Sequence, residues 1–201
     1  VLGSRGLGDV YKRQVYYNED WLQAAKYVCS PPIRKKADRD ALWRAIRRGE
    51  VQTVSTDHCS FTLAQKDAGR EDFTKIPGGL PGVETRGELI YSYGVAAKKL
   101  SLAQMCRVLS ENPAKLYGLY PRKGVLAPGS DADIVIYDPG DSHVIRAEDC
   151  VANVDYNPYE GFVTAGGIRE VWLRGRKTVE NGKVLDTVPA GMYLARGKCD
   201  L

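Results

Sequence analysis

The 201-residue sequence is poor in histidine, with only His58 and His143, which lie far apart in the chain. A metal centre built from several of its own histidines is therefore excluded. Apolar runs are also short, and none exceeds four residues. The sequence thus predicts neither a membrane-spanning segment nor the apolar core of a signal peptide, and we expect no membrane partner.

Cysteine is scarce and scattered, with five residues and no C-x-x-C pair. An odd number of widely separated cysteines favours reduced, mostly buried thiols over a disulfide framework. We therefore expect a cytoplasmic protein. Cys59 has no activating base at a recognisable spacing, so we expect a buried and inert thiol there.

Charge of one sign is not strongly dominant, since 29 basic residues against 25 acidic ones give a net charge of +4. The excess lies in the first fifty residues, which hold eleven basic and six acidic side chains. The basic residues of segment 34–48 match no known nucleic-acid-binding motif, so we interpret them as a solvated helix face. No nucleic-acid partner is expected.

Residues 1–14 have no hydrophobic period and include the string GLGDVYK. Its spacing matches neither G-x-x-x-x-G-K-[ST] nor G-x-G-x-x-G, so nucleotide binding is not predicted. We interpret residues 1–14 as an extension, disordered or artefactual.

A strand–helix–strand pattern follows. Residues 24–30 predict a buried strand, and residues 51–56 a second one rich in β-branched side chains. Between them, residues 37–48 predict an amphipathic helix with Asp38 as N-cap and Gly49 as its end. This order is typical of a βαβ unit, in which the two strands are parallel.

The carboxyl ends of parallel strands share one edge of the sheet, so Ser30 and Asp57 would face the same mouth. The Asp57 carboxylate at this mouth could be compensated by a metal, a cation or hydrogen-bond donors, which would indicate a functional role. It could instead cap the next helix. Both interpretations stay open. His58 would point the other way, and we expect a hydrogen-bonded core residue rather than a ligand. His143 lies in a polar loop and is expected to be solvated.

The middle of the chain predicts further helices. Residues 87–99 allow one helix, and residues 101–111 predict another with a capping box of Ser101 and Gln104. A short helix then begins at Asn112-Pro113 and ends at Gly118.

After Pro121 the residue pattern changes to short strand-like segments separated by Pro-Gly, Gly-Gly and Asn-Gly. Asn181-Gly182 predicts a two-residue hairpin turn. The expected strands of this small β module are 123–127, 133–137, 169–173 and 177–185.

Three motifs, in this order, resemble the dihydropyrimidinase (D-hydantoinase) family, cyclic amidohydrolases of the metal-dependent amidohydrolase superfamily. They are YVCSPPIR at 27–34, TVSTDHC at 53–59 and KIPGG at 75–79. Segments 112–115, 124–137 and 159–161 look like the same family. The resemblance runs from about residue 15 to the C-terminus.

The resemblance implies an α/β fold, namely the C-terminal part of a TIM (β/α)8 barrel followed by a small β-sandwich lobe. Residues 15–119 would hold the last strands and helices of the barrel. Residues 120–201 would form the β lobe and a C-terminal tail.

The resemblance also implies site residues. Asp57 matches the aspartate that ligates the more buried of two zinc ions and acts as general base, moving a proton from the metal-bridging hydroxide to the leaving ring nitrogen. Ser30 matches a residue that binds the cyclic amide largely through its backbone. Gly78 stands where many members have asparagine, at a substrate contact that uses the main chain.

The implied activity is hydrolysis of the ring amide of dihydropyrimidines or 5-substituted hydantoins to N-carbamoyl amino acids, by a homotetrameric parent protein. The family's H-x-H pair, its carboxylated lysine and two further histidines have no counterpart in the sequence. Because a barrel takes about 250 residues, we interpret the chain as a C-terminal fragment that is inactive alone. Alternatives are a dihydroorotase or allantoinase, or a non-catalytic scaffold homologue.

Overall fold

Helices occupy the first part of the chain and strands the last part in the computed structural model, which describes residues 24–185 and 191–201. The expectation for residues 1–14 lies outside the described residues. The helical segments are α3 (Lys36–Arg48), α4 (Leu63–Asp67), η2 (Phe73–Lys75), α5 (Arg86–Ile90), η3 (Tyr91–Ala96), α6 (Leu102–Cys106), η4 (Arg107–Glu111), α7 (Asn112–Leu116) and η5 (Ala147–Asp149). The strands are β1 (Ile134–Asp138), β2 (Gly167–Leu173), β3 (Arg176–Glu180) and β4 (Lys183–Val184).

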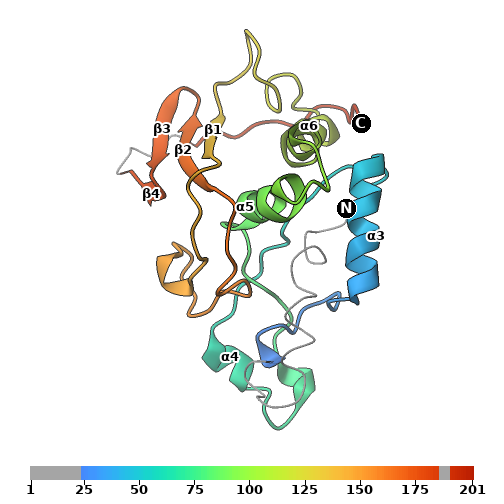
Figure 1. The fold of residues 1–201 in the computed structure, drawn as a ribbon, viewed down its shortest axis with the longest axis vertical. Coiled ribbons are helices and arrows are strands. Elements are labelled where there is room, and N and C mark those ends of the chain that lie inside the picture. Colours follow the sequence, from blue (N-terminus) through green and yellow to red (C-terminus); the bar gives the residue numbers. More distant parts are fainter. Residues whose placement is uncertain (1–23, 186–190) are drawn as a thin grey trace.

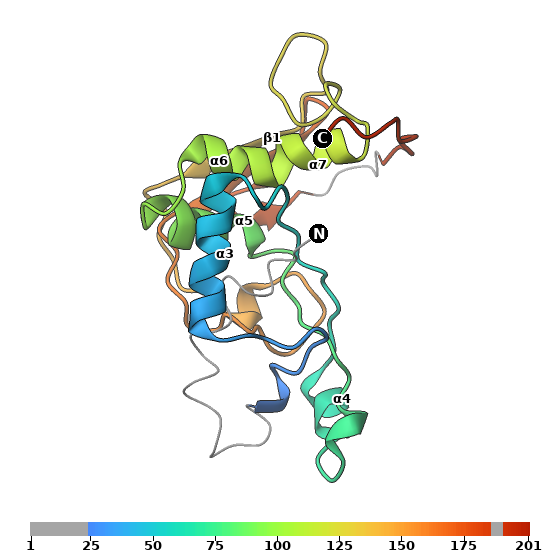
Figure 2. The same ribbon diagram turned by 90° about the vertical axis from the view of Figure 1, so that its right-hand side faces the viewer.

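The central helices lie between α3 and the strands in Figure 1, with α3 on the right and the sheet on the left. The segment around α4 lies at the lower end of the molecule in both views, away from α6 (Figure 1, Figure 2). None of the helices in the described ranges is long and apolar enough to cross a membrane.

Helix α3 confirms the helix predicted over 37–48. It ends at Gly49, whose φ of 77° is the left-handed conformation that glycine adopts without strain. Asp38 is not the N-cap, because Lys35 takes that position and donates its backbone N–H to the Asp38 carboxylate. The basic residues of α3 are exposed except for the half-buried Arg39, and the interpretation of this segment as a solvated face stays a prediction.

The main core lies where α3 packs against the segments that follow it. Trp43 and Ile46 supply the buried face of α3. They pack with apolar side chains from 51–54 and from the helical segments beyond: Val51, Val54, Ile90, Leu100 and Val108. Burial of this apolar stripe, rather than helix propensity, holds the helices together.

The two strands predicted at 24–30 and 51–56 are not present. Residues 24–28 form a helical turn closed by local hydrogen bonds, and 51–56 has strand character only at one bridge residue, Ser55. A strand needs a neighbouring strand to satisfy its backbone. Val54 instead donates its N–H to the Val108 carbonyl of η4, and the described residues contain no parallel pair.

The helices predicted beyond residue 85 are confirmed, with one change of geometry. The Ser101 hydroxyl accepts from the Gln104 N–H, and the Gln104 side chain accepts from the Ser101 N–H, which is the expected capping box. The segments η3 and η4 are π-helical turns that continue α5 and α6. Gly118 follows α7 with a φ of 64°.

Strands β1 to β4 form one antiparallel sheet in chain order. This confirms the strands expected near 133–137, 169–173 and 177–185. The strand expected at 123–127 is wrong, because Gly124 has a φ of 85° and packs so closely on α7 that a Cβ would lie 2.6 Å from the Ala114 Cβ. The described residues show no second sheet of a sandwich, and an isolated bridge joins Val144 to Val163 outside this sheet.

The Asn181-Gly182 hairpin turn, with φ values of 49° and 74°, should be sensitive to a side chain at its second position. No atom lies near a Cβ added at Gly182, so only backbone strain opposes the change. We expect Gly182→Ala to lower the free energy of unfolding by about 1 kcal/mol. Chemical denaturation measures it. The matched control is Gly82→Ala, equally open and without a positive φ; equal effects of the two changes would contradict the assignment.

Candidate active site

Three segments that are distant in sequence meet below helix α3, beside α4: residues 28–30, 57–59 and 77–83. The Gly79 N–H donates to the Val28 carbonyl at 3.1 Å, and the Cys59 N–H donates to the Leu80 carbonyl at 3.0 Å. Segment 77–83 is therefore bonded to both others. These segments carry all three residues that the resemblance assigns to the site.

Ser30 and Gly78 lie against each other at the surface. A Cβ added at Gly78 would lie 3.6 Å from the Ser30 nitrogen and 3.7 Å from its Cβ, which is ordinary van der Waals contact. Both residues are exposed, whereas Cys29 and Gly79 beside them are buried. The main chains of Ser30 and Gly78 thus form one accessible floor over a packed layer.

Asp57 is exposed and has a φ of 47°, in the left-handed region. Few residues other than glycine adopt this conformation, and aspartate is among the more tolerant. Such backbone strain is common at functional sites, where the surrounding structure holds it. The Cys59–Leu80 hydrogen bond holds the chain just beyond Asp57 against the segment that contains Gly78.

His58 anchors the loop that follows Gly79. Its Nδ1 accepts the backbone N–H groups of Gly82 at 3.1 Å and Val83 at 3.3 Å. An accepting Nδ1 places the proton of the neutral ring on Nε2. The hydrogen-bonded role was expected, but the ring is exposed rather than part of the core.

Lys66, on α4, is the residue that sequence reasoning missed. Its side chain is fully buried, and its Nζ donates to three backbone carbonyls: Val28 at 2.8 Å, Pro77 at 2.6 Å and Gly79 at 2.9 Å. An ammonium has three N–H donors, and all three are used. The Thr62–Gln65 capping box that begins α4 has the same pattern as the one at Ser101, so the sequence did offer a signal for this helix.

Burial lowers the pKa of Lys66 to about 8, because the charged form loses its hydration. The neighbouring Cys29 and Cys59 oppose this shift. Near neutral pH the group is therefore mostly an ammonium, and it can donate all three hydrogen bonds.

The expectation for the cysteines is corrected. Cys59 is exposed, and of the five cysteines, all within the described ranges and all free thiols, Cys29 alone is buried. His143 is exposed, as expected, and its ring also has partners: its Nε2 lies 3.4 Å from the Glu88 carboxylate and its Nδ1 lies 3.1 Å from the Thr164 hydroxyl. Burial raises the pKa of Glu88, and His143 acts against that increase.

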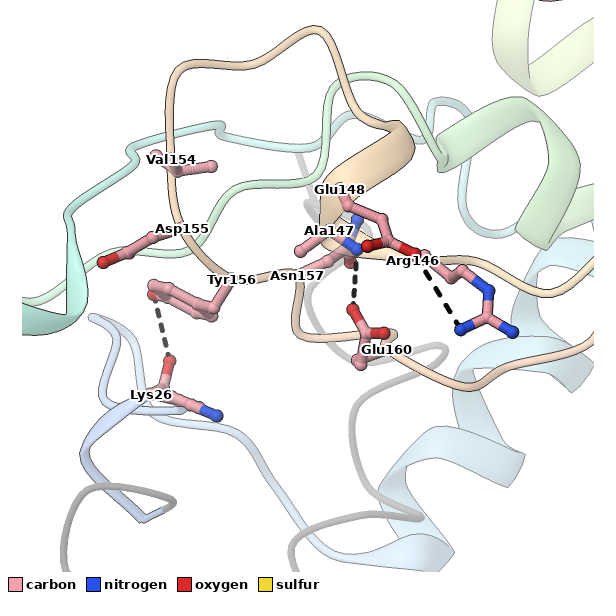
Figure 3. A pocket seen from close by; sticks show the side chains of 9 residues that line it. All are labelled: Lys26, Arg146, Ala147, Glu148, Val154, Asp155, Tyr156, Asn157 and Glu160. Atoms are coloured by element: carbon pink, nitrogen blue, oxygen red, sulfur yellow. Dashed lines mark hydrogen bonds and ion pairs between the residues drawn. The ribbon is translucent and has the colours of Figure 1, made fainter.

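A polar pocket of about 490 Å³ lies elsewhere, between the turn at Lys26 and the loops of the β module (Figure 3). The buried Tyr156 donates its hydroxyl to the Lys26 carbonyl, and Glu160 accepts the Ala147 N–H. None of Ser30, Asp57 and Gly78 lines it. The candidate site is therefore the exposed floor and not this pocket.

The described residues do not make a complete metal site. Within them, no group of three or more His, Cys, Asp or Glu side chains is placed to hold an ion. Catalytic zinc sites use about three protein ligands, and Asp57 could supply one. We derive no chemical step through a metal from these residues.

The chain belongs to the Amidohydrolase family, whose profile matches residues 19–184. Family membership implies a TIM-barrel-type α/β fold, and the family is generally metal-dependent. Among its relatives is a D-hydantoinase of Streptomyces coelicolor, 43% identical over 88% of this chain and 38% of its own length. A D-hydantoinase of Geobacillus stearothermophilus is 42% identical over 92% of this chain and 40% of its own length.

Solved structures similar to this chain carry the same names as these relatives or related ones. A D-hydantoinase crystal structure matches 92% of this chain and 40% of its own with a TM-score of 0.87 at 42% identity. A dihydropyrimidinase from Brevibacillus agri matches 81% of this chain and 35% of its own, with a TM-score of 0.79 at 47% identity. The chain thus spans about two-fifths of the length of the curated relatives it matches.

The neighbouring glycines 78 and 79 should differ sharply in their tolerance of a side chain. A Cβ at Gly79 would lie 2.4 Å from the Cys59 carbonyl oxygen, so the backbone would have to move, whereas Gly78 has room. We expect Gly79→Ala to lower the free energy of unfolding by about 2 kcal/mol or more, and Gly78→Ala by less than about 0.5 kcal/mol. Denaturant titration of both variants tests this, and a reversed order would contradict the packing described.

The titration of Lys66 gives a second test. Its pKa of about 8 in the folded chain lies below the ordinary lysine value of 10.5, so between these pH values the unfolded chain binds the proton more tightly. The contribution of Lys66 to the free energy of unfolding therefore increases with pH in this window. Lys66→Arg keeps its charge throughout this pH window. Relative to that variant, the free energy of unfolding of the wild type should increase by about 2–3 kcal/mol from the lower to the upper end of the window.

The direct measurement is the ¹³Cε shift of Lys66 by NMR against pH. We expect one lysine signal to titrate near pH 8 and to vanish in Lys66→Arg. A midpoint at 10 or above would show that the ammonium is not desolvated as described.

Proposed function

We propose that this chain contributes the substrate floor and one metal ligand to a metal-dependent cyclic amidohydrolase. The reaction is hydrolysis of the ring amide of dihydropyrimidines or 5-substituted hydantoins to N-carbamoyl amino acids. The observation that carries the proposal is the junction of segments 28–30, 57–59 and 77–83, because it gathers the three motifs of the family at one exposed place. Relatives named D-hydantoinase and dihydropyrimidinase support it.

In this proposal the roles follow from chemistry. The backbone groups of Ser30 and Gly78 bind the polar edge of the cyclic amide, and their exposure suits a small planar ligand. The Asp57 carboxylate would be one ligand of one of two zinc ions, and as general base it would hold and release the proton that the leaving ring nitrogen needs. The remaining ligands come from outside the described residues.

Gly78 replaces the asparagine of many relatives, and the space beside Ser30 admits a side chain there. Because the proposed contact uses the main chain, the change leaves the role intact.

The wider assignments are also proposals. We infer that residues 15–119 belong to the C-terminal part of a barrel and that 120–201 are its β lobe and tail. We infer a homotetramer of full-length chains in the cytoplasm. We further infer that the chain alone is inactive, because among the described residues Asp57 would supply one of the about three protein ligands that a catalytic zinc needs.

The test is Asp57→Asn in the full-length protein, with hydantoin and dihydrouracil as substrates. Loss of both the metal ligand and the base should lower kcat/KM by about 10³-fold or more while circular dichroism stays unchanged. The matched control, Asp67→Asn, removes a surface carboxylate that pairs with Arg70 and should leave turnover unchanged. Turnover of Asp57→Asn near the wild-type rate would refute the assigned role.

A further inference from the structure

Lys66 joins the two segments of the proposed substrate floor through one atom. Its Nζ bonds the Val28 carbonyl on one segment and the Pro77 and Gly79 carbonyls on the other. The Gly79 N–H also donates to the Val28 carbonyl, so that oxygen accepts one hydrogen bond from Lys66 and one from the segment 77–83. The two segments are therefore fixed to each other and not only to helix α4.

The acceptors stand next to the proposed contact residues. Pro77 and Gly79 flank Gly78, and Val28 precedes Ser30 by two positions. Peptide planes are rigid, and the bonded Pro77 carbonyl shares a plane with the Gly78 N–H, while the bonded Gly79 N–H shares a plane with the Gly78 carbonyl. Both backbone groups of Gly78 are therefore fixed in direction. The hydrogen bond from the Lys66 Nζ to the Val28 carbonyl holds the chain that leads into Ser30.

The surroundings leave Lys66 little freedom. Its side chain is fully buried, with its Nζ 5.5 Å from the centre of the Phe61 ring. The capping box of Thr62 and Gln65 fixes the start of α4, from which the side chain reaches inward. The three oxygens lie at 2.6–2.9 Å, a range typical of hydrogen bonds from an ammonium.

We propose that Lys66 is a positioning residue for the cyclic-amide substrate, because it holds the backbone groups of Ser30 and Gly78 in the spacing that the ring requires. The proposal rests on the proposed function. Lys66 does not touch the substrate and takes no part in proton transfer. It acts through the main chain that the substrate contacts.

The experiment compares Lys66→Met and Lys66→Arg with the wild type in the full-length protein. Methionine keeps the length but has no donor. Arginine keeps the charge, but its planar fork does not match three oxygens that converge on one atom. Lys183→Met, an exposed lysine on β4, is the matched control.

We expect KM for hydantoin to increase about 10-fold or more in Lys66→Met and about 3-fold in Lys66→Arg, with bound metal unchanged, since small displacements of binding groups weaken substrate positioning. Lys183→Met should keep the wild-type KM. A purely structural role gives a different signature, because loss of folded enzyme lowers the apparent kcat at constant KM.

A folded Lys66→Met enzyme with wild-type KM would overturn the proposal. So would a fall in kcat alone, or the failure of both variants to fold, which would make Lys66 a folding residue only. Absence of turnover in the wild type instead refutes the proposed function, so the two failures are distinguishable.

Discussion

The hydrogen bonds of the Lys66 ammonium are the constraint on which the candidate site depends. Burying a charged amine costs several kcal/mol. Hydrogen bonds that involve a charged group contribute about 1.5–3 kcal/mol each, so three of them offset a large part of that cost, and the lowered pKa of Lys66 reflects the part that remains. Without the ammonium, the carbonyls of Val28, Pro77 and Gly79 would each lose a partner in the interior.

The residues proposed for the site lie at the surface, above this buried layer. Ser30, Asp57 and Gly78 are exposed, while the residues that hold their segments together are packed beneath them. This division lets short irregular loops carry functional groups in fixed positions. It also explains why Gly79, which approaches the Cys59 carbonyl, has no room for a side chain, while Gly78 has.

Carboxylates connect this part of the molecule to the β module. Asp155 accepts the N–H of Leu63 at the start of α4, and Glu84 accepts the N–H groups of Val151 and Ala152. Glu88 of α5 accepts the N–H of Ile168 at the beginning of β2. The helical part and the β module are thereby joined through hydrogen bonds as well as through the apolar packing of Leu89 with Ile145 and Tyr159.

The sequence predicted what is encoded locally. The helix at 36–48 and the capping box at Ser101 follow from periodicity and end signals, and the turn at Asn181-Gly182 from its dipeptide. The strands at 24–30 and 51–56 were wrong because an apolar run becomes a strand only beside a partner strand. Lysine is rarely fully buried, and the carbonyls that Lys66 binds are 11, 13 and 38 residues away. No local pattern could reveal that junction. Ser30 and Asp57 were singled out from strands that the structure does not contain and from the family motifs, and Gly78 from the motifs alone.

The most direct test of the central claim is an NMR measurement of scalar couplings across hydrogen bonds in the selectively labelled protein near neutral pH. The account predicts couplings from the Lys66 ¹⁵Nζ to the backbone ¹³C′ of Val28, Pro77 and Gly79. An ammonium of Lys66 in rapid exchange with water, with no coupling to these three carbonyls, would contradict it.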